Sequence, residues 1–126
     1  MGHLPVMAAT GNTAIAQRWI EAFNAHDVAA LVALYDDACR HTSPKIRALY
    51  PDTGGEIVGK AALTQWWTDS MQRIAGLRYE PTAIIANDHS VVLEYVRHAD
   101  GAAPMPVAET FDVENGRIVR SRVYHG

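Results

Sequence analysis

One acidic residue near the end of the chain stands on a strand face that is otherwise apolar. In VAETFDV, residues 107–113, a period of two places Glu109 on one face with Phe111 and Val113. Burial of a carboxyl group raises its pKa, and a buried acid can donate a proton or a hydrogen bond at neutral pH. Glu109 is therefore a candidate catalytic acid. The alternative is a carboxylate at the sheet edge that reaches water or Arg97 across a hairpin.

A histidine supplies the second candidate for proton transfer. The segment CRHTSP, residues 39–44, is typical of a brief strand that ends at a proline. If Cys39 points inward, His41 and Ser43 point inward with it, because side chains alternate along a strand. An imidazole titrates near neutral pH and suits a general base. His41 is therefore a candidate base, the alternative being a histidine that is hydrogen-bonded at the rim of the fold.

Metal or cofactor chemistry is not indicated. His98 and His125 stand at predicted strand ends and could be imagined with His41, but no two of them have a short ligand spacing. The single Cys39 offers no thiolate cluster and no internal disulfide. We therefore expect no metal and no cofactor, and we expect a reducing, cytoplasmic environment.

Bulky aromatic side chains could line an apolar pocket or fill the core. For Trp19 and Tyr35 both interpretations stay open, and at least one of Trp66 and Trp67 should be core. The candidate ligand-binding residues are Trp19, Tyr35, Trp66, Tyr95, Phe111, Ser121, Val123 and His125. Such a lining favours a small apolar molecule as the ligand.

Apolar spacing predicts the helices that must position these residues. A stripe at Ile15, Trp19 and Phe23 predicts a helix over residues 12–27, capped by its first or second residue, Asn12 or Thr13. A second helix is predicted over residues 26–39, capped by Asp27, and a third over residues 60–74. Residues 45–55 are expected to form a long loop, and residues 56–59 a short strand.

Four strand-like runs follow, over residues 77–87, 90–98, 106–113 and 117–125, and the Asn-Gly pair at 115–116 predicts a hairpin. On the last run, small and apolar side chains should face the helices, and the charged face should meet water or a second subunit. The expected inward set is Val119, Ser121, Val123 and His125. The expected outward set is Ile118, Arg120, Arg122 and Tyr124.

Helices followed by an antiparallel meander predict an α+β fold. We expect residues 1–12 to be a flexible leader and residues 13–126 to form a single domain. A net charge of −3 argues against nucleic acid as a partner. The first 13 residues lack a basic start and a long apolar run, so we expect no signal peptide and no membrane span.

The order of RWIEAFNAHDVAALVALYDDA, QWW, VVLEYV and FDVENGRIVRSRVYH resembles the nuclear transport factor 2-like superfamily. Within it, the chain is similar to SnoaL-like polyketide cyclases and ketosteroid isomerases, from about Thr13 to the end. The resemblance implies a cone-shaped α+β barrel, with three N-terminal helices packed on a strongly curved, mostly antiparallel sheet. It also implies a pocket between helices and sheet, and a homodimer through the outer face of the sheet.

The resemblance can be followed residue by residue. In ketosteroid isomerases an acid and a Tyr form an oxyanion hole, and an Asp acts as base. The acid falls on Glu109, whereas the Tyr falls on Trp19 and the Asp falls on Thr42 or Ser43, neither of which is a base. An essential carboxylate on the last strand of the cyclases falls on Val123.

These substitutions leave two hypotheses of different classes. The leading one is a cofactor-independent acid–base enzyme of the isomerase, cyclase or dehydratase type, acting on a small apolar carbonyl or polycyclic compound. His41 would be its base and Glu109 its acid or oxyanion partner. The alternative is a non-catalytic module that binds a small ligand or mediates association. A single cavity shared by both side chains would favour the enzyme, and exposure of either would favour the module.

Overall fold

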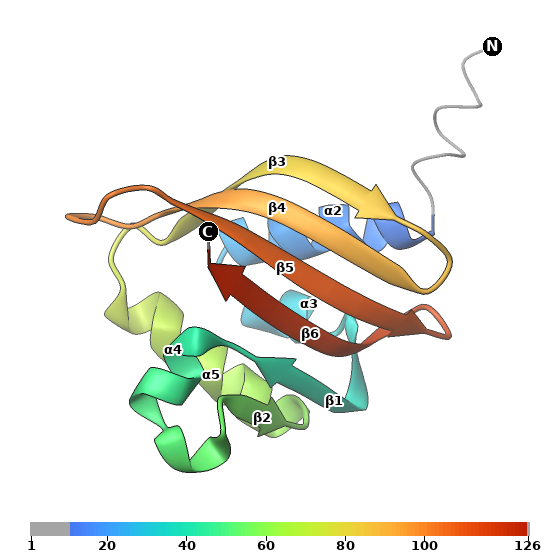
Figure 1. Cartoon of the computed structure of the whole chain (residues 1–126), viewed down its shortest axis with the longest axis horizontal. Helices are drawn as coiled ribbons and strands as arrows, with labels where there is room; N and C mark the ends of the chain where they lie inside the picture. The colour runs from blue at the N-terminus through green and yellow to red at the C-terminus, as the bar shows by residue number, and fades with distance from the viewer. Residues whose placement is uncertain (1–10, 126) are drawn as a thin grey trace.

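A computed structural model describes residues 11–125, in which α-helices precede and interrupt a six-stranded sheet (Figure 1). The helices are α2 (Asn12–Asn24), α3 (Val28–Val32), α4 (Pro44–Leu49), the 3-10 helix η1 (Pro51–Thr53) and α5 (Lys60–Arg73). The strands are β1 (Tyr35–Thr42), β2 (Glu56–Val58), β3 (Arg78–Ala86), β4 (Ser90–His98), β5 (Met105–Glu114) and β6 (Arg117–His125). Residues 1–10 of the expected leader lie outside the described residues.

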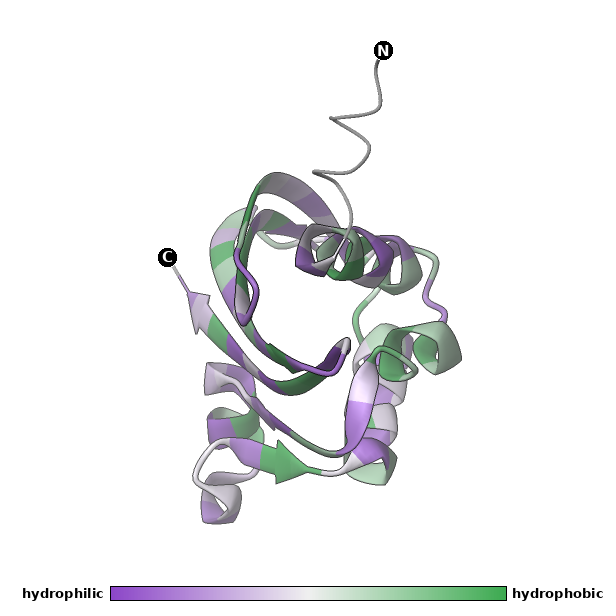
Figure 2. Cartoon of the chain, turned by 90° about the vertical axis from the view of Figure 1, so that its right-hand side faces the viewer, coloured by the Kyte–Doolittle hydropathy of each residue, from purple (hydrophilic) through white to green (hydrophobic). Residues whose placement is uncertain are grey.

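The sheet has the strand order β2-β1-β6-β5-β4-β3 and curls around the helices. All neighbouring strands are antiparallel except β1 and β6, which pair in parallel. Figure 1 shows α2 and α3 behind the strands, and Figure 2 shows the strands curving around one side of the molecule with helices on the concave side. The predicted α+β class, with a strongly curved and mostly antiparallel sheet, is confirmed.

The core fills the concave side of the sheet. Trp19 of α2 is completely buried and contacts Phe23 and Phe111 at ring-centroid distances of 5.4 Å. The predicted stripe on this helix is therefore its buried face, and it packs mainly against β3. Aromatic rings in such contact contribute beyond the area that they bury.

One of the two predicted helix caps is present in the structure. Asp27 caps α3 as predicted, because its Oδ1 accepts a hydrogen bond from the backbone N–H of Ala30 at 3.0 Å. The predicted cap of α2 is wrong, since Gly11 occupies the N-cap position and Asn12 is already helical. The Asn12 side chain instead donates to the carbonyl oxygen of Asn87 at 2.7 Å, which ties the helix to the β3–β4 turn.

The second predicted helix is too long. It ends at Val32, and from Tyr35 onward the chain forms β1, which pairs in parallel with β6. The pairing starts where the backbone N–H of Ile118 donates to the carbonyl oxygen of Leu34 at 2.9 Å. Pairing with a strand distant in the sequence therefore outweighs the helical spacing of residues 31–35.

The predicted loop after β1 contains a helix. Ser43 caps α4 by accepting a hydrogen bond from the backbone N–H of Lys45 at 3.1 Å, and Pro44 occupies the first turn. Serine at the cap followed by proline is a standard helix start. The short strand that was predicted after this segment is present as β2.

A β-bulge changes which residues of β6 face inward. The Asn115–Gly116 turn has φ values of 53° and 75°, as the predicted Asn-Gly hairpin requires. Beyond it, Val113 partners Ile118 whereas Asp112 partners Arg120, so β6 carries one extra residue. The prediction that Ile118 faces outward is therefore wrong, because the bulge turns its fully buried side chain into the core.

Within residues 11–125, no helix combines the length and the apolar character that a membrane span requires.

Replacing Ile118 by Ala should lower the free energy of unfolding by about 2–5 kcal/mol, because the change leaves a cavity in the core. Chemical denaturation measures this loss. Ile85 is 64% exposed on β3, so Ile85→Ala is the matched control and should change the value by about 0.5 kcal/mol or less. Equal losses in the two variants would contradict the inward orientation of Ile118.

Candidate active site

A cavity of about 50 Å³ lies on the concave side of the sheet, between the strands and α5. Its buried wall includes His41, Trp67, Tyr95 and Glu109, each at most 3% exposed. Apolar and cationic side chains surround its more exposed end. The cavity has room for a few water molecules or for one end of an organic ligand.

Strand register brings the polar side chains of this wall together. His41 of β1 and Ser121 of β6 are direct partners in the parallel pair. On β5, Glu109 partners Val123, two residues along β6 from Ser121, and Tyr95 of β4 lies diagonally opposite Glu109. Side chains in such positions on one sheet face are within reach of each other.

Glu109 is buried in this wall, with 2% of its surface exposed. Its Oε1 accepts a hydrogen bond from the Tyr95 hydroxyl at 3.0 Å, whereas its Oε2 has no hydrogen-bond partner among residues 11–125. Burial raises the pKa of Glu109 to about 8, against the smaller lowering effect of the Tyr95 hydrogen bond. Glu109 therefore carries a proton at neutral pH. The predicted inward orientation of Glu109 is confirmed. The alternative, a carboxylate at the sheet edge that reaches water or Arg97, is wrong.

A chain of buried hydrogen bonds holds His41. The Trp19 indole N–H donates to the Tyr35 hydroxyl at 3.2 Å, and Tyr35 donates to Ser121 Oγ at 3.0 Å. Ser121 Oγ lies 2.6 Å from Nδ1 of His41. Because an indole N–H can only donate, Tyr35 accepts from Trp19 and gives its own hydrogen to Ser121 Oγ. The hydrogen bond between Ser121 Oγ and Nδ1 then fixes the orientation of the His41 ring.

His41 and Glu109 form a neutral pair at rest. Nδ1 of His41 is 4.0 Å from Oε2 of Glu109. Burial lowers the pKa of His41 to about 3, so the imidazole is uncharged at the pH where Glu109 keeps its proton. Burial also raises the pKa of Tyr35 and of Tyr95 well above the ordinary value, so both remain hydroxyl donors.

The candidate ligand-binding residues divide into two groups. Those that line the cavity are Trp66, Tyr95, Val123 and His125. The structure corrects the placement of the others, because Trp19, Tyr35, Phe111 and Ser121 are fully buried behind the wall. Three of these four form the hydrogen-bond chain, so they orient His41 instead of contacting a ligand.

Sequence reasoning missed several residues of the lining. They include Trp67 of α5 and Tyr79 of β3, and the Tyr79 ring stacks on Tyr95 at 4.1 Å between centroids. An alternation of two residues along this strand places Tyr79 on the same face as the apolar Leu77, and this pattern could have identified it. Lys45 was missed because its segment was expected to be a loop, and Arg73 because it stands in the last turn of α5.

No three histidine, cysteine, aspartate or glutamate side chains gather as metal ligands in the described part of the chain. His98 lies outside the cavity lining, and its Nε2 is 2.9 Å from Oε1 of Glu80, within hydrogen-bond distance.

Comparison with protein families gives one match, to the SnoaL-like domain, over residues 16–121. A search of curated proteins gives no match. Among solved structures, a SnoaL-like protein of unknown function from Burkholderia thailandensis is 27% identical with a TM-score of 0.81. The alignment covers 90% of this chain and 92% of that one.

Two further solved structures share the fold at lower identity. A candidate polyketide cyclase from Xanthomonas campestris pv. campestris is 24% identical, with a TM-score of 0.75 and coverage of 90% of this chain and 89% of that one. TerC, co-crystallised with polyporic acid, is 16% identical, with a TM-score of 0.80 and coverage of 93% and 92%.

Titration should give Glu109 a pKa of about 8, and Tyr95→Phe should raise it further, because the Tyr95 hydrogen bond favours the ionised form. Carbon-13 NMR of labelled carboxyl groups measures both values, and Glu109→Gln identifies the resonance. A carboxyl that titrates near the ordinary value of about 4.3 would contradict its burial in a dry wall.

Stability should vary with pH in two windows. Native Glu109 holds its proton until about pH 8, whereas the unfolded chain releases it near 4.5, so its contribution to the free energy of unfolding falls as pH rises between these values. Native His41 stays neutral until about pH 3, whereas the unfolded chain protonates near 6.5, so its contribution falls as pH drops through that window. Between pH 6.5 and 8, Glu109 is the member of this pair that changes the free energy of unfolding.

Denaturation of Glu109→Gln at several pH values checks this dependence. The variant should lose the part of the decline between pH 6.5 and 8 that the unmodified chain shows. Glu94 is exposed on the neighbouring strand, so Glu94→Gln is the matched control and should keep the decline. An identical pH profile for Glu109→Gln and the unmodified chain would rule out the raised pKa.

Proposed function

The chain belongs to the SnoaL-like domain family, and on this premise we propose that it is a cofactor-independent acid–base enzyme. The reaction would move a proton next to a carbonyl group, as isomerases, cyclases and dehydratases do. The observation that carries the proposal is the neutral pair in the cavity wall, in which protonated Glu109 lies 4.0 Å from neutral His41.

Glu109 acts as the acid through Oε2. This oxygen is buried and has no hydrogen-bond partner within residues 11–125, which is costly for a polar atom. A substrate carbonyl oxygen in the cavity supplies the missing acceptor for the carboxyl proton. Because Tyr95 holds Oε1, the free oxygen is oriented before the substrate enters.

His41 acts as the base and depends on Glu109 for its strength. A buried imidazole with a pKa of about 3 is a weak base while its neighbour is neutral. When Glu109 gives its proton to the carbonyl oxygen, the new carboxylate lies 4.0 Å from His41 in a low-dielectric site and makes the imidazole a stronger base. His41 then takes a proton from the α-carbon, and the electron pair of the broken C–H bond becomes the double bond of the enol.

The residues that replace the usual groups fit this assignment. Thr42 or Ser43 falls where the isomerases have a base, and the Ser43 hydroxyl caps α4. His41 is two residues earlier on the same face of β1 and reaches the cavity. Val123 lines the cavity where the cyclases carry a carboxylate, which leaves Glu109 as the one acidic residue of the lining within residues 11–125.

A second candidate function is a non-catalytic module that binds a small ligand. The small cavity favours it, because about 50 Å³ is far below the ~300–1,000 Å³ of common ligand sites. Entry of a whole substrate requires the side chains at the exposed end to move. The polyporic acid bound to TerC supports a small organic ligand for the same fold under either function.

Deuterium exchange of ketones separates the two functions without knowledge of the natural substrate. In D₂O the protein should accelerate the loss of the α-proton signals of cyclohexanone, followed by proton NMR. Glu109→Gln and His41→Gln should each reduce the acceleration by about 100-fold or more, since both proton-transfer groups are needed. Glu94→Gln, which changes an exposed carboxylate, should leave it unaltered.

A thermal-shift titration with cyclohexanone shows whether the ketone binds. Binding without exchange in the unmodified protein would favour the module. Exchange that survives Glu109→Gln would exclude this residue as the acid.

A further inference from the structure

Three cationic side chains and one histidine surround the exposed end of the cavity. They come from four different elements and line the same cavity as Glu109, and they are Lys45 of α4, Arg73 of α5, Arg97 of β4 and His125 of β6. Lys45 and Arg97 are half-buried, and Arg73 and His125 are exposed. We call these four residues the cationic mouth.

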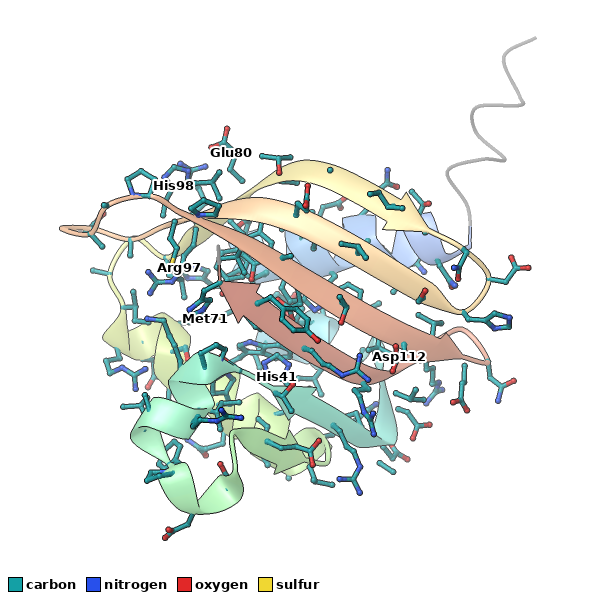
Figure 3. All side chains as sticks on the ribbon, viewed as in Figure 1. His41, Met71, Glu80, Arg97, His98 and Asp112 are labelled. Carbon is teal, nitrogen blue, oxygen red and sulfur yellow. The ribbon has the colours of Figure 1, made fainter. Side chains whose placement is uncertain are left out.

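None of these four side chains lies within 4.0 Å of a carboxylate in the described part of the chain, although the structure has ion pairs elsewhere. Glu80 pairs with His98, and Asp112 pairs with Arg122. Figure 3 shows Asp112 toward the end of the sheet opposite to Arg97. The positive charge at the mouth is therefore not neutralised by these acids.

The charged groups of Lys45, Arg73 and Arg97 are close enough for the two arginines to act on Lys45. Burial, and then the charges of Arg97 and Arg73, lower the pKa of Lys45. Burial, and then the charges of Lys45 and Arg97, lower the pKa of His125. Like charges that converge from separate elements oppose folding unless an anion compensates them. The mouth thus resembles a binding site for an oxyanion, which no acidic side chain among residues 11–125 supplies.

We propose that the substrate is a small organic oxyanion, a carbonyl compound that also bears a carboxylate or phosphate group. Its carbonyl end enters the cavity toward Glu109, and its anionic group stays at the cationic mouth. Arg97 offers the planar set of N–H donors that suits an oxyanion. This inference rests on the proposed function for the placement of the carbonyl end.

The rest of the lining fits such a molecule. Trp66, Ile74 and Leu77 line the cavity together with the cations, so a carbon skeleton has apolar contacts. Glu109 does not repel the anion, because its carboxyl group is neutral. The expectation of a purely apolar ligand changes accordingly: the ligand has an apolar body and one charged end.

Matched probes test the charge directly. Methyl-ketone acids of increasing chain length, beginning with 4-oxopentanoate, are titrated against the protein, and each is compared with its primary amide. Calorimetry or NMR should show at least one acid binding about tenfold more tightly than its amide. The preference should shrink as salt is added, because the mouth is partly exposed.

Variants locate the preference. The double variant Lys45→Gln with Arg97→Gln should remove most of the preference for the acid over its amide. Arg117→Gln removes one positive charge at the β5–β6 turn, outside the cavity lining. This control variant should keep the preference for the acid. Circular dichroism checks folding, and loss of mutual repulsion should raise the melting temperature of the double variant.

Equal affinity for every acid and its amide would overturn the inference, and so would a preference that survives the double variant. The readout is binding, so a catalytically inert pocket would still show the preference. Failure of the proposed function appears separately, as absence of deuterium exchange in cyclohexanone, which has no charge.

Discussion

The burial of one carboxyl group is the constraint on which the proposed chemistry depends. Glu109 projects from β5 into a wall of aromatic and aliphatic side chains, where ionisation would cost more than in water. The group therefore keeps its proton, and the imidazole of His41 stays neutral for the same reason. In the proposed reaction, charge develops in the wall when a proton moves, and both charges of the new pair would lie 4.0 Å apart. An acid in a wetter site would lose its proton before any substrate arrived.

The curled sheet keeps this wall dry and in register. The parallel pairing of β1 with β6 sets His41 beside Ser121, and the bulge in β6 keeps Ser121 inward while it turns Ile118 into the core as well. Without the extra residue, alternation would point one of the two outward. The backbone irregularity at Val119 lies only two residues before Ser121, a member of the hydrogen-bond chain from Trp19.

The same irregularity marks where prediction from sequence stops. A period of two was sufficient to orient Glu109, because β5 alternates regularly around it and its neighbours are strongly apolar. It failed for Ile118, since a bulge leaves no local signature in the residues RIVRS. The start of β1 at Tyr35 was also missed, because parallel pairing depends on a strand far away in the sequence. The sequence was sufficient to name Glu109 and His41 as candidates. It was not sufficient to predict the hydrogen bonds that hold His41.

The distribution of charge over the molecule sharpens the choice of ligand. The chain has a net charge of −3, so an anion is repelled by the surface as a whole and attracted at the cationic mouth. An inorganic anion could gain this attraction, but it has no carbon skeleton to fill the apolar part of the cavity. A neutral ketone could fill the cavity but gains nothing at the mouth. A molecule with both parts satisfies the two conditions together, and discrimination follows from the sum of the two contributions.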